Sequence, residues 1–296
     1  MGKVISFINM KGGVGKTTLT INIGKQLSER GKSVLIIDMD PQFNATQTLL
    51  LHMKKNPILS KEIDEVGKNI DSSKYYKELS ERHETASQIF ESAEIVEEKN
   101  LIKEIDENLY LIPGDLDLYK QLSGNTDGKL FAVLKYLKEK SILDNYNYIL
   151  IDCPPVWSIL TKSSLIASDY YVIPSKIDLY SAMGINLLEE QITKEILEYQ
   201  KNKIFTGNLK KLGIIFTLVH KGNVTEQNLM GLLEKQFSDT TFFEHNLPHF
   251  PSLSNRVNLI ADVKNDSKYF DLTNSLEKIT EEFVKKVSEE ELEYGQ

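Results

Sequence analysis

A glycine-rich segment near the start of the chain has the residue types of a phosphate-binding loop. Its sequence is Lys11-Gly12-Gly13-Val14-Gly15-Lys16-Thr17-Thr18. Glycines let successive backbone N–H groups turn toward one point and form a nest for an anion, and a helix beginning near Lys16 would add its positive end. Lys16 would reach the β- and γ-phosphates of a nucleotide, and the Thr17 hydroxyl would bind Mg²⁺. We therefore expect residues 11–18 to bind ATP.

The first half of this loop departs from the usual pattern, which is G-x-x-x-x-G-K-[ST]. Met10 occupies the position of the first glycine, and a second lysine, Lys11, follows it. Phosphate binding within one chain does not need that lysine. From its position alone, Lys11 is better interpreted as a solvated surface residue.

Asp152 is the second feature with clear chemistry. It ends the apolar run Tyr148-Ile149-Leu150-Ile151. A carboxylate at the end of a buried strand needs compensation, and a magnesium-bound water is a natural partner for it. The alternative is that Asp152 caps a helix beginning near Ser158.

The elements that must position these residues alternate along the chain. Apolar runs typical of strands buried on both faces occur at 3–9, 33–37, 109–112, 148–151, 170–173 and 212–218. Helical patterns occur at 16–30, 130–139, 182–200, 225–237 and 271–287. This alternation predicts an α/β fold, a mostly parallel, twisted β-sheet flanked by helices on both faces. Ligands bind such sheets at the carboxyl ends of the strands, where the loop, Asp38–Asp40 and Asp152 should converge.

Two segments stand outside this alternation. Residues 53–83 are polar and rich in lysine and glutamate, which indicates an insertion into the fold. Residues 288–296 form an acidic tail that we expect to fray. The sequence thus predicts a single domain over residues 1–287, with one insertion and one tail.

Composition limits the other classes of function. The chain has 296 residues and a net charge of −8, and arginine occurs only at Arg30, Arg82 and Arg256, which argues against a globally basic nucleic-acid binder. Cys153 is the one cysteine, so a disulfide framework within the chain is excluded. No run of 18 apolar residues could form a membrane-spanning helix. A cytoplasmic setting fits these features.

Four segments together resemble the ParA/MinD family of ATPases. Residues 11–18 resemble its deviant Walker A motif, and residues 38–46, Asp-Met-Asp-Pro-Gln-Phe-Asn-Ala-Thr, resemble its switch segment. Residues 148–155 resemble its Walker B strand, and residues 167–184 its next strand and helix. The switch segment is especially typical of ParA-type (Soj-like) partition ATPases. The likeness covers residues 3–50 and 108–200 well.

The resemblance implies roles for individual residues. Two subunits of the family enclose two ATP molecules, and Lys11 would reach the nucleotide of the partner subunit. Asp40 would orient the attacking water, so Lys11, Lys16 and Asp40 become the candidate catalytic residues. Asp40 could otherwise simply form a turn before Pro41. Thr17, Asp152 through water, and more indirectly Asp38 would hold Mg²⁺.

The resemblance also implies a function. We expect a slow, Mg²⁺-dependent ATP hydrolase that segregates plasmid or chromosomal DNA as an ATP-bound homodimer. It would bind DNA without sequence preference, associate with the nucleoid, and be released after a centromere-binding, ParB-type partner stimulates hydrolysis. The candidate DNA contacts are Lys194, Lys201, Lys203, Lys210, Lys211, Arg256, Lys264 and Lys268.

A MinD-like membrane-positioning ATPase is the alternative. It would need a basic amphipathic helix at a terminus, and the acidic residues 288–296 would repel anionic lipid. We therefore expect no stable membrane association. The resemblance places base-recognising segments after Thr217 and near residues 247–251, where Pro248-His249-Phe250-Pro251 does not follow the family pattern.

Overall fold

The structure is a computed structural model of the whole chain. It describes residues 1–55, 72–91, 100–123, 128–178, 180–201, 207–237, 241–251 and 259–294. Within these residues, no helix is long and apolar enough to cross a membrane.

The strands form one sheet in the order β3-β4-β2-β5-β1-β6-β7-β8. Its members are β1 (Lys3–Phe7), β2 (Val34–Asp38), β3 (Lys103–Asp106), β4 (Leu109–Ile112), β5 (Tyr148–Asp152), β6 (Tyr170–Ser175), β7 (Lys210–Val219) and β8 (Leu247–Pro248). The neighbouring strands pair in parallel, except that β3 pairs antiparallel with β4 at one edge. The predicted α/β class and the mostly parallel sheet are confirmed.

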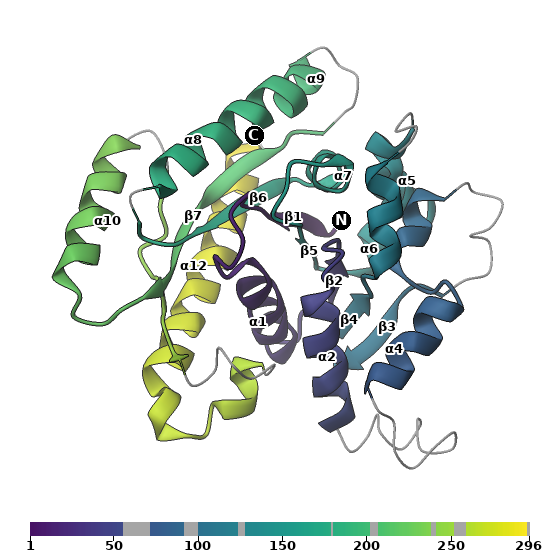
Figure 1. Cartoon of the computed structure of the whole chain (residues 1–296), viewed down its shortest axis with the longest axis horizontal. Coiled ribbons are helices and arrows are strands. Elements are labelled where there is room, and N and C mark those ends of the chain that lie inside the picture. Colours follow the sequence, from purple (N-terminus) through teal and green to yellow (C-terminus); the bar gives the residue numbers. More distant parts are fainter. Residues whose placement is uncertain are drawn as a thin grey trace.

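Helices cover both faces of the sheet, and in Figure 1 α10 lies at one end of the long axis while α4 and α5 lie at the other. The helices are α1 (Lys16–Glu29), α2 (Asn44–Lys55), α4 (Ser72–Glu81), α5 (Ala132–Glu139), α6 (Ile142–Asn145), α7 (Ile159–Ala167), α8 (Ser181–Ile192), α9 (Glu198–Lys201), α10 (Val224–Gln236) and α12 (Phe270–Tyr294). A π-helical turn, η4 (Thr193–Leu197), joins α8 to α9. Short 3₁₀ helices are η1 (Ala86–Phe90), η2 (Leu116–Leu122), η3 (Lys129–Phe131), η5 (Ile260–Val263) and η6 (Ser267–Tyr269).

Two apolar cores result from the alternation of side chains along the strands. Leu35 and Ile37 of β2 point into the core that α5, α7 and α8 cover, whereas Val34 and Ile36 point into the core under α1, α2 and α12. Gly24 of α1 lets that helix approach the sheet, because a Cβ there would lie 2.8 Å from Cδ1 of Ile36. The close packing holds the middle of α1 against β2 and β5.

Helix α12 continues farther than the sequence predicts. We expected a frayed tail from Ser288, but the helix extends to Tyr294. Lys210 of β7 donates to the Glu290 carboxylate at 2.6 Å, and the Ser288 hydroxyl donates to the backbone of Val284 at 2.9 Å. These contacts extend the helix past the last predicted apolar residue, Val287.

The predicted insertion, residues 53–83, is described in part. Helix α2 ends at Lys55, and α4 begins at Ser72, while residues 56–71 lie outside the described part of the chain. Tyr75 and Tyr76 of α4 pack against the core under α1 and α2. This half of the insertion is therefore attached to the fold beside residues 40–46.

Candidate functional site

The glycine-rich loop joins the end of β1 to α1, as expected. Gly13 and Gly15 have φ angles of 65° and 81°, which glycine adopts without steric cost. Asn9 accepts from the Lys11 backbone N–H at 2.9 Å and donates to the Pro174 carbonyl at 2.8 Å, which ties the loop to β6. The neighbouring strand β6 therefore helps to fix the loop.

The strand β7 also holds this loop. The Thr217 hydroxyl lies 2.7 Å from the carbonyl oxygen of Val14 and 3.3 Å from that of Ser175. A Cβ built on Gly15 would lie 3.5 Å from Thr217. The loop is thus confined between α1 and the end of β7.

Lys16 lies at the start of α1 with only 6 % of its surface exposed. Its Nζ is 3.4 Å from the Lys11 carbonyl oxygen. Burial lowers the pKa of Lys16, although the nearby charges of Asp152 and Asp40 oppose that shift. A buried ammonium beside a nest of backbone N–H groups is suited to bind a polyanion.

Thr17 and Asp152 lie together as the sequence predicts. The Thr17 hydroxyl donates to Oδ2 of Asp152 at 2.6 Å. Asp152 is fully buried, and its Oδ1 has no hydrogen-bond partner among the described residues. Burial and the charge of Asp38 raise the pKa of Asp152 well above its usual range. A cation bound here would relieve that cost.

Asp38 has its hydrogen-bond partners in the segment that follows β2. Its Oδ2 accepts from the Thr46 backbone N–H at 2.8 Å and from the Thr46 hydroxyl at 2.7 Å. Its Oδ1 accepts from the Asp40 N–H at 3.2 Å. Burial raises the pKa of Asp38 to about 7. These bonds hold the first turn of α2, so Asp38 is positioned against α2 rather than against Thr17.

Asp40 begins the turn that follows β2 and is 8 % exposed. Its Oδ1 accepts from the Gln42 backbone N–H at 2.9 Å. Burial raises the pKa of Asp40, while the Gln42 hydrogen bond and the Lys16 charge oppose the rise. The carboxyl group thus lies near the ammonium of Lys16 in a partly desolvated position.

Lys11 contacts its own chain in this structure. Its ammonium forms an ion pair with Asp178, which precedes α8. The Lys11 side chain is 42 % exposed and that of Asp178 is 34 % exposed. This ion pair is at the surface and contributes little to stability, so Lys11 can leave it at low cost.

The glycine-rich loop, Lys16, Thr17 and Asp40 line a cavity of about 620 Å³, within the range of small-molecule sites. One side, which we call the polar side, is formed by residues 12–18 together with Asp40, Gln42, Asn44, Gln47 and Thr48. The opposite, apolar side contains Leu218, Leu247, Pro248, His249, Phe250, Ile260 and Leu272. Because strands lie about 4.8 Å apart, β8 is about 14 Å from β1. A nucleotide with its phosphates at β1 would extend its base toward this side.

A pair of histidines borders the apolar side. Nδ1 of His249 lies 2.8 Å from Nε2 of His220, and Nδ1 of His220 lies 2.7 Å from the Glu226 carboxylate. The His249 backbone N–H also donates to the Val219 carbonyl at 2.9 Å. These contacts attach the segment after β8 to the end of β7.

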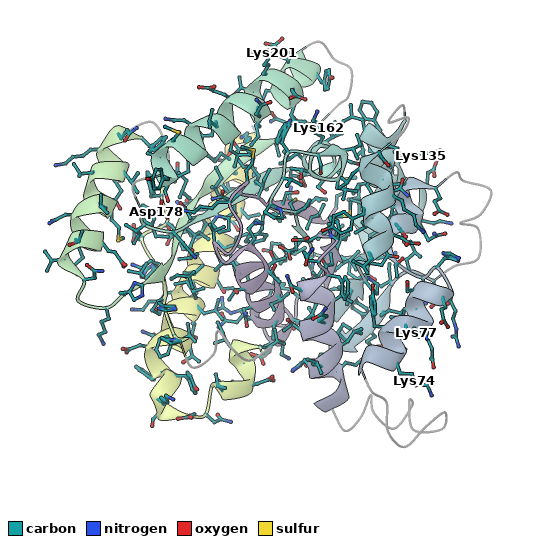
Figure 2. The ribbon with its side chains drawn as sticks, in the orientation of Figure 1. Lys74, Lys77, Lys135, Lys162, Asp178 and Lys201 are labelled. Atoms are coloured by element: carbon teal, nitrogen blue, oxygen red, sulfur yellow. The ribbon has the colours of Figure 1, made fainter. Side chains whose placement is uncertain are left out.

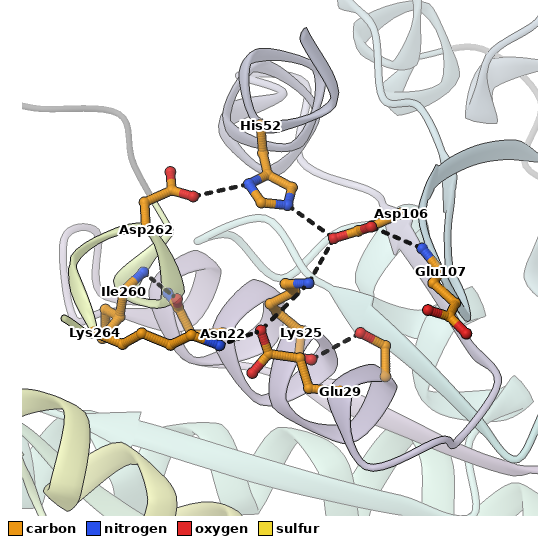
Figure 3. Close-up of polar contacts among 10 residues, drawn as sticks. Asn22, Lys25, Glu29, His52, Asp106, Glu107, Ile260, Asp262 and Lys264 are labelled. Atoms are coloured by element: carbon orange, nitrogen blue, oxygen red, sulfur yellow. Dashed lines mark hydrogen bonds and ion pairs between the residues drawn. The ribbon is translucent and has the colours of Figure 1, made fainter. Parts of the chain in front are cut away.

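A charged network connects the walls of the cavity (Figure 3). His52 of α2 contacts Asp262 of η5 at 3.0 Å and Asp106 of β3 at 3.1 Å. Lys25 of α1 donates to Asp106 at 2.6 Å. Burial would lower the pKa of His52, but the hydrogen bonds to Asp262 and Asp106 outweigh it and raise that pKa. The network fixes α2 against η5.

The predicted DNA contacts that the structure describes belong to several elements, and most of them have an acidic or aromatic partner. Lys210 and Lys211 of β7 form ion pairs with Glu290 and Glu189, each at 2.6 Å. Lys201 lies at the outer end of α9 (Figure 2) and is 3.8 Å from Glu198, while Lys194 is exposed in η4. Lys264 contacts Glu29 at 3.2 Å, and Lys268 lies over the ring of Tyr269. Lys203 and Arg256 lie outside the described residues.

Sequence reasoning missed several residues that hold the site. Asn9, Thr46, Thr217 and Asp178 contact the loop, Asp38 or Lys11 from positions distant in the sequence. Short polar side chains at the ends of predicted strands were the available signal for Asn9 and Thr217. Nothing in the local sequence marks Asp178 as the partner of Lys11.

Comparisons with known proteins agree with this geometry. Residues 2–206 match the AAA domain family. An uncharacterized protein from Methanocaldococcus jannaschii is 34 % identical over 243 residues, 79 % of this chain and 80 % of that protein. The sporulation initiation inhibitor protein Soj from Bacillus subtilis is 29 % identical over 247 residues, 82 % of this chain and 83 % of Soj.

Among solved structures, a plasmid partition protein from Borrelia burgdorferi bound to AMPPNP is similar to this chain. Its TM-score is 0.70 at 26 % identity, and the match covers 97 % of this chain and 100 % of that one. The relatives and the phosphate loop together identify the family. The chain is a member of the AAA domain family and, within it, of the ParA-type ATPases.

Proposed function

We propose that this chain is an ATP-dependent DNA partition ATPase that hydrolyses ATP slowly and acts as a two-state switch. The observation that carries the proposal is the Thr17–Asp152 hydrogen bond of 2.6 Å beside the buried Lys16 and the glycine-rich loop. Membership of the ParA-type family supports the same reading.

The donor set fits Mg²⁺. The Thr17 hydroxyl and the unpartnered Asp152 oxygen are hard oxygen donors, the type of ligand that Mg²⁺ prefers. Thr17 would hold the ion directly, and Asp152 would hold it through water. The ion would neutralise charge on the phosphates. Asp40 would orient the attacking water, because it lines the same cavity as Lys16 and Thr17.

Lys11 would act in a pair of subunits. We propose that it leaves Asp178 when two ATP-bound chains meet and contacts the phosphates of the partner's nucleotide. Lys11→Ala should keep ATP binding and lose ATP-dependent dimerisation or turnover, as measured by light scattering and phosphate release. Unchanged dimerisation and turnover would refute this role.

The ATP-bound dimer would bind DNA through lysines and release it when a ParB-type partner stimulates ATP hydrolysis. In the cell it would lie in the cytoplasm, on the nucleoid when ATP is bound. The test is binding to a DNA duplex of arbitrary sequence with ATP, with ADP and without nucleotide, at two salt concentrations. We expect binding with ATP only, and weaker binding at higher salt because phosphate contacts release counterions.

Two controls complete this experiment. Lys16→Ala, which lacks the phosphate-binding lysine, should bind DNA weakly under every condition. Anionic lipid vesicles test the membrane alternative. ATP-dependent lipid binding without DNA binding would overturn the partition function in favour of a MinD-like role.

A further inference from the structure

The turn after β2 contains a strained residue. Phe43 has a φ angle of 43°, in the left-handed region that residues with a Cβ rarely adopt unless they are asparagine or aspartate. Such a conformation persists only where surrounding contacts compensate it. The Phe43 N–H donates to the Asp40 carbonyl at 2.8 Å, so the strain lies inside the turn that begins with Asp40.

An aromatic stack holds Phe43 from outside this turn. Its ring lies against the ring of Tyr76 in α4, with centroids 4.4 Å apart and planes inclined by 10°. Tyr76 also packs against the core under α1 and α2, which limits its movement. Burial raises the pKa of Tyr76 to about 12, so the side chain stays neutral.

A second contact holds the middle of the turn. Gln42 donates from its side chain to the Tyr119 hydroxyl of η2 at 2.7 Å, and its backbone N–H donates to the Asp40 carboxylate at 2.9 Å. The orientation of the Asp40 carboxyl group therefore depends on the backbone of Gln42 and Phe43. That backbone in turn depends on contacts from α4 and η2.

We propose that Tyr76 is a positioning residue for ATP hydrolysis, which acts through Phe43 to hold Asp40 at the polar side of the cavity. The inference rests on the proposed ATPase function. It assigns a role to the second half of the predicted insertion, since α4 then supports the turn that precedes α2. Without the stack, Phe43 relaxes to a negative φ angle, and Gln42 and Asp40 move with it.

The first test uses full-length variants in steady-state ATP hydrolysis with Mg²⁺. Tyr76→Ala should lower kcat by roughly 10- to 100-fold, since small misplacements of catalytic groups have effects of this size. ATP affinity should change much less than kcat, because no residue of α4 is among the described residues that line the cavity. Tyr76→Phe keeps the stacking ring and should restore most of kcat. Tyr75→Ala, on the same helix and packed against the same core, is the matched control with normal turnover.

A second test separates positioning from a general loss of structure. Asparagine tolerates left-handed backbone, whereas alanine does not, so Phe43→Asn should keep more turnover than Phe43→Ala. If Tyr76 acts through Phe43, then Tyr76→Ala added to Phe43→Asn should lower kcat much less than it does in the wild-type chain. An equal loss in both backgrounds would overturn the proposal.

The outcomes distinguish the inference from the function on which it rests. A wild-type chain that does not hydrolyse ATP would refute the proposed function. Wild-type turnover together with normal kcat in Tyr76→Ala would refute only the role of Tyr76. If Tyr76→Ala fails to fold by circular dichroism, the comparison of Phe43→Asn with Phe43→Ala decides, and equal kcat in those two variants would overturn the inference.

Discussion

The polar and apolar sides of the cavity consist of different types of residue from different segments of the chain. On the polar side, buried charged groups come from the ends of β1, β2 and β5, and named hydrogen bonds fix them, as with Thr17 and Asp152. On the apolar side, Leu218, Phe250 and Leu272 come from later segments and offer shape and apolar surface. The charged groups are suited to bind and activate a polyanion, whereas the apolar groups are suited to hold a ligand by shape and apolar contact.

Mutations on the two sides should also differ in their effect on nucleotide binding. A charge on the polar side would interact with the phosphates, so the effect of its loss on binding should depend on how many phosphates the ligand carries. A contact on the apolar side would meet the base, so its loss should be equal for ATP and ADP. Measurements with both nucleotides therefore test whether the two sides have separate roles.

Lys16→Ala should have the largest effect. Loss of a buried ammonium with charge-assisted hydrogen bonds should weaken ATP binding by roughly 100-fold, and ADP binding by less. Equilibrium titration with fluorescent ATP and ADP analogues measures both. Lys135→Ala, an exposed lysine of α5, is the control. Equal losses for the two nucleotides would contradict the assignment of Lys16 to the terminal phosphates.

Asp40→Ala, on the polar side, should lower the rate of ATP hydrolysis without weakening ATP binding. Removal of the group that orients water should lower kcat by roughly 100-fold, while ATP binding stays close to that of the wild-type chain. An ATP-bound pair of subunits should then accumulate, which size-exclusion chromatography with ATP detects. Normal hydrolysis by this variant would show that Asp40 merely forms the turn before Pro41.

Phe250→Ala should have a moderate effect from the apolar side. The loss of aromatic surface should weaken nucleotide binding by roughly 10-fold, by the same factor for ATP and ADP. Phe270→Ala is the matched control, since Phe270 is 66 % exposed at the start of α12 and does not line the cavity. A larger loss of affinity for ATP than for ADP would contradict the separate roles of the two sides.

His52→Gln should have the smallest effect of these variants. His52 of α2 contacts Asp262 of η5 and so joins the two sides of the cavity. Asp262 and Asp106 hold the pKa of His52 above its ordinary value of 6.5. The protonated ring therefore stabilises the folded chain fully below that value, and the stabilisation is lost as pH rises through the folded-state pKa. In thermal unfolding, the Tm of the wild-type chain should exceed that of His52→Gln by roughly 2–4 °C at low pH, and by less at high pH. A difference independent of pH would contradict this.

The sequence predicted the polar side well, because its chemistry is local. A glycine-rich loop between a strand and a helix and carboxylates at strand ends follow from the residues themselves. The structure brings Lys16, Thr17 and Asp40 to one cavity, and Asp152 lies behind it, hydrogen-bonded to Thr17. The alternating apolar runs likewise predicted β1, β2, β4, β5, β6 and β7. In these segments, burial on both faces determines the residue types directly.

The apolar side could not be predicted in the same way. Strand β8 has two residues, Leu247 and Pro248, and shows no periodicity. The edge strand β3 reads Lys-Glu-Ile-Asp, which is too polar to suggest a strand. The left-handed Phe43 and its stack on Tyr76 depend on two segments meeting in space. Such features depend on tertiary contacts, which local patterns do not encode.

The position of α12 has a consequence for synthesis of the chain. Phe283 stacks on Phe7 of β1, with centroids 6.3 Å apart, and also contacts Tyr148 of β5. A ribosome delivers β1 long before it delivers residues 270–294, so one face of the central strands lacks part of its apolar cover during most of translation. The early strand–helix units expose that part of the face until this helix emerges. A late helix thereby completes the apolar core that α1 and α2 begin.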